Sequence, residues 1–477
     1  MSDNRFPAPT SLRVVGRHCA GMLRPAFTAI VLAAVLLNAP SEASAATRAV
    51  PAGAPMEEAI RFQYAVYYLP APTRDPVAAL QMLLRTKQFR IKAVSGLPET
   101  LGEPLVSARL EKDVAHKYAP PDMKALQYFG RGLSREQAQA LQESREALIL
   151  NFGHASAHVW SGARAATELV ELVARETAGL VWDEETREIF TPDEWHKRRV
   201  ASWTEAVPDV SRHITIHAYQ DKAYVRAISL GMVKFGLPDV VVENFSWSSN
   251  SSMGNLLNAF CQAMAEGARF AKPGAYDLDL RAIRNAAVRD RQVGFLKANA
   301  RSVAHLALIQ GTREEGDPRN RLIEIAFDRY PGADVHARQD ALLSSLYGWE
   351  DAIKRIRHDG ELEAASRRAR AKLPKLRAAF TAGLAPGEFI QVKAPFATPK
   401  GDNEWMWVEV TEWKGKKIRG LLKNEPFDIP DLHGGQLVPV NEDEVFDYIR
   451  NFPNGTQEGN ETGKIIQEMR GDIERSK

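Results

Sequence analysis

The chain contains 477 residues, of which 44% are apolar and 26% are charged, and its formal net charge is +2 at pH 7. These values are close to the averages of globular proteins, and the length suffices for several domains with separate cores. They exclude a wholly disordered chain, a collagen and a multi-span membrane protein.

The first 45 residues have the pattern of an export signal. Phe27 to Ala39 forms an uncharged apolar run, Arg24 precedes it, and Ala43 to Ala45 supplies small residues for cleavage. A membrane anchor is the alternative, but the run is shorter than the roughly 20 residues that a spanning helix needs. We therefore expect a periplasmic or secreted protein cleaved near Ala45, with translation starting at Met1 or at Met22.

Removal of residues 1–45 would take away four arginines and two acidic residues and leave a mature chain of zero formal charge. Balanced charge gives no whole-molecule attraction to nucleic acid, so we expect no nucleic-acid partner, and no transmembrane span in the mature chain. Cys261 would be the one remaining cysteine, which excludes an internal disulfide. Its apolar neighbours predict a buried, unreactive thiol.

Residues 58–272 predict an α+β domain with helices packed on a mixed sheet. Residues 147–152 have the composition of a buried strand, and residues 157–177 repeat apolar positions at helical spacing. A second strand, helix and strand are predicted at 213–219, 222–235 and 240–245.

Residues 273–352 predict a middle region made of a hairpin and a helix, because two alternating segments flank a polar turn. Residues 353–385 predict a basic helical connector. Nine Lys or Arg residues and three acidic residues lie between 353 and 377, which indicates either a solvated face or a docking surface for an acidic partner. Residues 386–470, rich in short strands, predict a small bent sheet or partial barrel.

Two stretches resemble bacterial families without a known activity. The segment from about 364 to 468, with FIQVKAPF, EWMWVEVTEW, KIRGLLKNEP and GNETGKII in order, resembles the domain-of-unknown-function family 2314. The segment from about 147 to 266, with GHASAHVW, AGLVWDEETREIFTPDEW and SLGMVKFGLPDVVVENF, is similar to family 4261. Neither resemblance implies catalytic residues, because function resides in sites rather than in folds.

Four histidines form the first candidate site. The chain has no HExxH, Walker A, Rossmann or GxSxG motif, so an enzyme would need a site built from distant residues. His154 and His158 flank a strand-to-helix junction, and His213 and His217 lie four residues apart, on the same face of a predicted strand. If these side chains converge, they could bind zinc, copper or nickel, and Glu168 or Asp221 could be a further ligand. The alternative is that the four histidines are ordinary polar or hydrogen-bonded residues.

A row of tryptophans forms the second candidate site. Strand alternation from Glu404 to Trp413 places Trp405, Trp407, Glu409, Thr411 and Trp413 on one face. An exposed row could stack on a sugar or a peptide, with Glu409 accepting a hydrogen bond. The alternative is that these aromatic residues fill the core of the small domain.

A third cluster contains acidic residues, at 183–185 and 193–194, beside Trp182 and Trp195. Paired carboxylates beside aromatic residues are typical of glycosidases. We favour a structural explanation, in which residues 183–186 form a hairpin turn and Thr191 caps a helix with Pro192 at its first position.

These observations favour an exported, non-catalytic protein that binds an envelope protein or a glycan. No cofactor is expected, apart from a metal if the histidines converge. The alternatives are a metal-dependent or other hydrolase at His154, His158, His213 and His217, and a structural or immunity-like interaction protein.

Overall fold

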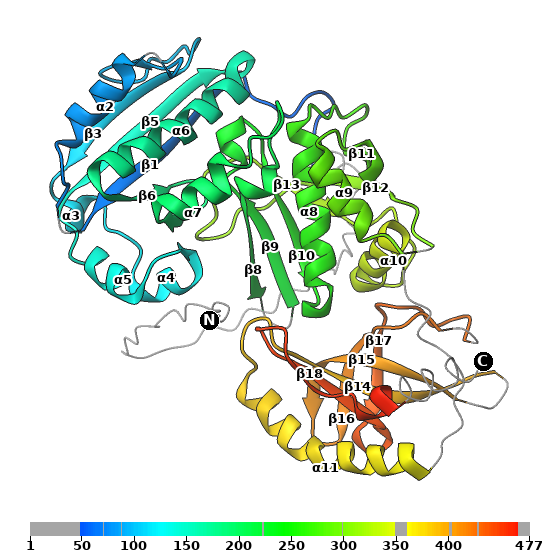
Figure 1. Cartoon of the computed structure of the whole chain (residues 1–477). Helices are drawn as coiled ribbons and strands as arrows, with labels where there is room; N and C mark the ends of the chain where they lie inside the picture. Colours follow the sequence, from blue (N-terminus) through cyan, green and yellow to red (C-terminus); the bar gives the residue numbers. More distant parts are fainter. Residues whose placement is uncertain are drawn as a thin grey trace, which may run out of the picture.

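The computed structural model describes residues 48–69, 71–86, 88–221, 224–297, 299–348, 360–399, 403–426 and 429–465. The expected signal peptide and the first residues of the expected connector lie outside these ranges. Within them, the chain folds as an α+β protein with three sheets, which confirms the predicted fold class (Figure 1).

The first sheet has the strand order β2-β3-β5-β1-β6-β7-β4. Its members are β1 (Ala59–Tyr68), β2 (Lys92–Ala93), β3 (Leu105–Glu111), β4 (Gly130–Arg131), β5 (Ala147–Ala155), β6 (Gly179–Asp183) and β7 (Glu188–Phe190). On one face pack α2 (Pro76–Arg85) and α6 (Val159–Thr177), whose apolar residues join Phe62, Tyr64 and Phe152 in the core. The predicted strand at 147–152 and helix at 157–177 are confirmed.

The other face of the first sheet is covered at one end by short helices. These are α3 (Val114–Lys117), α4 (Met123–Phe129) and α5 (Arg135–Leu141). Ser134 and Gln137 form a reciprocal capping box at the start of α5, which fixes the first turn of that helix. Leu126 and Leu141 pack against Tyr67 and Ile189 in a small second core.

The second sheet has the order β11-β12-β13-β10-β9-β8. Its members are β8 (Thr215–Asp221), β9 (Tyr224–Leu230), β10 (Asp239–Phe245), β11 (Ala275–Asp279), β12 (Val303–Gln310) and β13 (Leu322–Ala326). Because β10 pairs in parallel with β13, one sheet spans the expected domain at 58–272 and the expected middle region at 273–352.

The helix predicted at 222–235 is wrong. This segment contains β9, which pairs with β8 as a hairpin, and the short 3-10 helix η4 (Met232–Phe235). Every residue from Val225 to Leu230 is buried. A strand buried on both faces shows no alternation, so its apolar run resembles a buried helix.

Helices α8 (Asn250–Ala265), α9 (Ala286–Gly294) and α10 (Val335–Tyr347) pack on the second sheet. Residues of the first two sheets share one continuous hydrophobic core. Between the sheets run α7 (Pro192–Trp195), the π-helical turn η2 (His196–Val200) and the 3-10 turn η3 (Val210–Arg212).

The C-terminal region has its own core, beneath α11 (Gly360–Ala382). Its open antiparallel sheet has the order β17-β16-β15-β14-β18-β19. The members are β14 (Phe389–Ala397), β15 (Asn403–Lys414), β16 (Lys417–Leu422), β17 (Leu437–Asn441), β18 (Asp447–Asn451) and β19 (Gln457–Gly459).

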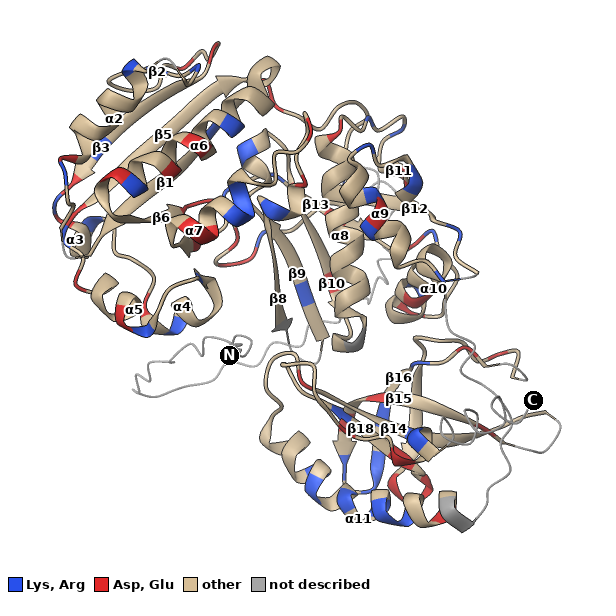
Figure 2. Ribbon diagram, viewed as in Figure 1, with Lys and Arg blue, Asp and Glu red and all other residues tan. Residues whose placement is uncertain are grey.

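Figure 2 shows basic residues along α11. Arg368 and Arg377 pair with Glu461 and Glu442, whereas Lys372 and Lys375 are exposed. No helix in the described part of the chain is long and apolar enough to cross a membrane.

Candidate functional site

The first two candidate histidines lie at the end of β5 and just before α6. His154 is buried at 1% exposure, stands edge-on to Phe62, and packs so closely on Gly162 that a Cβ atom there would overlap its ring. Burial lowers its pKa. His158 is half-buried in the 3-10 turn before α6, and its carbonyl accepts a hydrogen bond from Ser161.

His213 precedes β8 rather than lying in it. Its Nε2 atom is 2.8 Å from Oγ of Ser202, and its ring contacts Trp203 and Phe235. The Ser202 hydroxyl donates to the carbonyl of Arg199 at 2.7 Å, so Nε2 of His213 donates to Ser202. This arrangement provides no base for activating the serine.

His217 lies in β8, where its ring is 5.7 Å from Phe129 and 5.4 Å from Tyr219. The four histidines therefore contact different neighbours, with only His154 and His158 close enough to influence one another electrostatically. Glu168 pairs with Arg164, and the side chain of Asp221 lies outside the description. Among the described residues, no three His, Cys, Asp or Glu side chains gather as metal ligands would.

The tryptophan row is broken by a β-bulge. The pairing of β15 with β16 shifts register between Val410 and Glu412, so the extra residue Thr411 reverses the alternation beyond it. Trp413 consequently joins Met406, Val408 and Val410 in the C-terminal core, and its Nε1 donates to Glu442. Its predicted place on the face of Trp405 is wrong.

Trp405, Trp407 and Glu409 do share the face away from that core, but they do not form an open shelf. Trp405 packs 4.7 Å from the ring of Phe446, and Lys393 stands over the ring of Trp407. Glu409 is only 4% exposed. Both tryptophans are half-buried, so little flat aromatic surface is free for stacking.

The acidic cluster contains both the predicted turn and an unpredicted charge network. Asp183 accepts backbone hydrogen bonds from Glu185 and Thr186, and Thr191 caps α7, which confirms the turn and the cap. Asp183 also binds Arg199 and Lys234, and all three side chains are buried.

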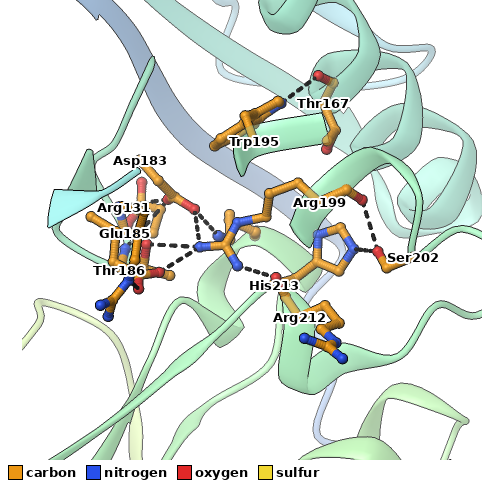
Figure 3. A network of polar contacts seen from close by, with 12 residues as sticks. Arg131, Thr167, Asp183, Glu185, Thr186, Trp195, Arg199, Ser202, Arg212 and His213 are labelled. Atoms are coloured by element: carbon orange, nitrogen blue, oxygen red, sulfur yellow. Dashed lines mark hydrogen bonds and ion pairs between the residues drawn. The ribbon is translucent and has the colours of Figure 1, made fainter. Parts of the chain in front are cut away.

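Arg199 is the centre of this network (Figure 3). Its guanidinium contacts Glu188 at 2.7 Å, Thr186 at 3.2 Å and the carbonyl of Arg212. Glu188 in turn binds Nε of Arg131 at 2.7 Å. Two carboxylates and three cations are thus held together by direct contacts, and these contacts offset part of the desolvation free energy of burying the charges.

Glu185 borders the network on the outer side of the first sheet. It lines a cavity of about 370 Å³ with Arg61, Gln63, Ser107 and Asn151. Burial, and then the charge of Asp183, raise the pKa of Glu185 to about 7. Such a carboxyl group exchanges a proton readily near neutral pH.

A larger cleft, of about 630 Å³, lies where the three sheets approach one another. It is lined by the end of α4 and β4, by β8, by the start of α8, and by two C-terminal loops. Its volume is in the usual range of small-molecule and peptide-side-chain sites, which concentrate at domain interfaces. Five half-buried aromatic side chains face it: Tyr128, Phe129, Trp247, Phe389 and Phe452.

Neighbouring contacts hold the walls of this cleft together. Nζ of Lys423, in the C-terminal region, lies 3.5 Å and 3.4 Å from the hydroxyl oxygens of Ser246 and Ser249, on either side of Trp247. The guanidinium of Arg450 lies 4.9 Å from the ring centre of Phe452 and pairs with Glu388.

The charge of the cleft lining is positive or neutral. Arg131 and His217 belong to it, whereas Asp and Glu do not occur among its described lining residues. Burial and the nearby Arg187 lower the pKa of His217, so its ring is neutral at pH 7 and can both donate and accept a hydrogen bond.

The sequence pointed to His217 only as a candidate metal ligand or catalytic residue, and it gave no sign of the aromatic residues that surround His217 in this cleft. Phe129, Phe389 and Phe452 stand at the ends of different elements, so no local spacing connects them. The one local signal is the turn sequence Asn451 to Gly455, which carries Phe452.

Comparison with known families matches the C-terminal part of the chain. Neither the curated proteins nor the solved structures contain a match to the chain. The similarity of residues 147–266 to family 4261 stays a prediction. Residues 359–477, which include α11 and the whole third sheet, match the family model of DUF2314, described as an uncharacterised protein conserved in bacteria, and this confirms the resemblance predicted for the C-terminal part.

Proposed function

We propose that this protein is a non-catalytic ligand-binding protein of the bacterial envelope, and that its binding site is the aromatic cleft between the three sheets. The observation that carries the proposal is the convergence of five half-buried aromatic side chains, from distant parts of the chain, on one cavity of about 630 Å³. The DUF2314 region supplies Phe389 and Phe452 to it.

Physical chemistry gives the cleft a specific capacity. Each aromatic ring that a ligand covers removes its remaining exposed apolar area from water, which stabilises the complex by about 25 cal/mol per Å². Arg131, His217, Asn250 and Ser251 supply the few polar groups that orient a ligand.

The envelope location is supported by the sequence. The uncharged run from Phe27 to Ala39 and the small residues at Ala43–Ala45 have the length and order of a cleaved export signal. The hydrolase alternative has less support, because the four candidate histidines contact different neighbours and three of them lie outside the cleft.

A fluorescent anion with an apolar ring system, 8-anilinonaphthalene-1-sulfonate, tests the site. The full-length chain should bind about one molecule of this dye per polypeptide, and the fluorescence emission of the dye should increase on binding. Ser251→Trp, at an exposed lining position at the start of α8, should fill the cleft and weaken binding about ten-fold.

Ser252→Trp is the matched control, since it adds the same side chain to the next residue of α8, which does not line the cleft. Equal dye affinity in the two variants would refute the proposed site.

A further inference from the structure

The cleft runs along the edge of a strand. Among the strands that the structure describes, β8 stands at the end of the second sheet and pairs with β9 alone, from Thr215↔Leu230 to Asp221↔Tyr224. Four consecutive β8 residues, Thr215 to Ala218, line the cleft. Consecutive side chains on a strand point to opposite faces, so a cavity that touches all four must follow the strand's edge rather than one face.

This edge carries unused hydrogen-bonding groups. A strand directs its N–H and C=O groups alternately to its two sides, and β9 occupies one side of β8. In the described part of the chain, the backbone of Thr215 to Ala218 forms no hydrogen bond to anything except β9. Each of these residues is half-buried, so the cleft walls shield the edge without closing it.

A cation lines the same cleft. Arg131 belongs to β4, which is the edge strand of the first sheet. Its Nε binds Glu188, whereas its two terminal nitrogens have no hydrogen-bond partner within the described ranges, and its side chain is 25% exposed. A guanidinium with two unpaired NH2 groups, in a cleft without Asp or Glu among its described lining residues, is complementary to a carboxylate.

We infer that the ligand is an extended peptide segment of another polypeptide, which adds to the β8 edge as a further strand and places a carboxylate on Arg131. The inference rests on the proposed function and names the ligand class of that same cleft. Four residues of β8 span about 13 Å, so the paired part of the peptide has about four to six residues. Strand addition supplies backbone hydrogen bonds, and the aromatic lining receives alternate side chains.

The probes are fluorescein-labelled heptapeptides in which Val and Thr alternate around a central Phe and a single Glu occupies each position in turn. Fluorescence anisotropy with the full chain should show one or two members of the set binding about ten-fold more tightly than the rest. Replacing Glu by Gln in the best peptide should weaken binding about ten-fold in the wild type and less than about two-fold in Arg131→Gln.

N-methylation of the peptide backbone distinguishes strand addition from side-chain binding. Methyl groups on the alternate amides that face β8 should weaken binding at least about ten-fold, and methyl groups on the other amides should change it by less than about two-fold. If methylation of either set of amides weakened binding equally, strand addition would be overturned. This comparison changes only the peptide, so it does not depend on the folding of a variant.

Two results separate the inference from the proposed function. If no peptide binds at about 1 mM while the dye still binds the cleft, the peptide assignment fails and the binding site survives. If dye binding is also absent, the proposed function fails. Concentration-dependent dimerisation blocked by Ser251→Trp, without peptide binding, would assign the edge to a second copy of the chain and overturn the inference.

Discussion

The Nζ atom of Lys234 lies 2.5 Å from Oδ2 of Asp183, and both side chains are fully buried. Asp183 ends β6 in the first sheet, and Lys234 belongs to η4, which connects β9 to β10 in the second. This ion pair therefore fastens the two sheets across their common core, and Arg199 joins it from η2.

Lys234→Met should lower the free energy of unfolding by about 3–5 kcal/mol, because it leaves part of the charge of Asp183 buried without its partner. Urea denaturation measures this loss. Asp183→Asn combined with Lys234→Met should recover part of the stability.

Arg164→Ala is the control, since it breaks the solvent-exposed pair with Glu168 and should cost less than about 1 kcal/mol. A Lys234→Met protein as stable as this control would contradict the role of the buried pair.

Glu185→Gln should change how stability depends on pH. The folded protein raises the pKa of Glu185 from 4.5 to about 7, so between these values the folded state binds more protons than the unfolded state. Stability from this group is therefore lost as pH rises from about 4.5 to 7. The variant should gain stability relative to the wild type across that window and keep a constant gain above it.

Denaturation curves at pH 4.5, 6 and 8 would show the difference. Glu143→Gln, at an exposed position in the same region, is the matched control. A constant difference between Glu185→Gln and the wild type at all three pH values would contradict the prediction.

Trp413→Ala should destabilise the C-terminal region by about 3–5 kcal/mol, because it leaves a cavity in the core beneath α11 and removes the hydrogen bond to Glu442. Trp407→Ala, four residues before Thr411, removes a half-buried ring and should cost clearly less. Thermal unfolding followed by tryptophan fluorescence compares the two, and equal losses would argue against the bulge.

Cys261 should be unreactive in the native protein. It is completely buried in α8, and burial raises the pKa of its thiol far above neutral pH, so almost no thiolate is present. Ellman's reagent should modify it only after addition of denaturant. Rapid modification of the native protein would show that α8 opens readily.

Export is testable by mass. If residues 1–45 are a cleaved signal, the intact mass of the protein from the periplasm or the medium should correspond to a chain that begins at Ala46. Retention of Phe27 to Ala39 in a membrane fraction would favour an anchor instead. Replacing Ala45 with Arg should block processing and serve as the control.

The sequence predicted correctly those elements whose structure is determined by residues close together in the chain. The helix at 157–177 and the Thr191 cap follow from spacing and hydrogen bonding within a few residues. The segment at 222–235 was predicted wrongly because β9 is buried by partners on both sides, which only the tertiary fold supplies. Likewise, the bulge at Thr411 carries no side-chain signature, yet it moves Trp413 to the other face.

The candidate site depends even more on long-range packing. The turn role of Asp183 was visible in its neighbours, but its partner Lys234 is 51 residues away and lay in a segment predicted as a helix. The cleft joins Phe129, Trp247 and Phe452 from three parts of the chain, and no periodicity relates them.

The position of β8 also has a consequence for the chain on its own. An uncovered strand edge beside apolar rings is a template for aggregation, and proteins protect such edges with loops, charges or neighbouring domains. The loops carrying Phe389 and Phe452 line the same cleft as β8, so we expect the DUF2314 region to hinder edge-to-edge association. A chain that ended at residue 348 would lack these C-terminal loops beside β8, and we expect it to precipitate during folding.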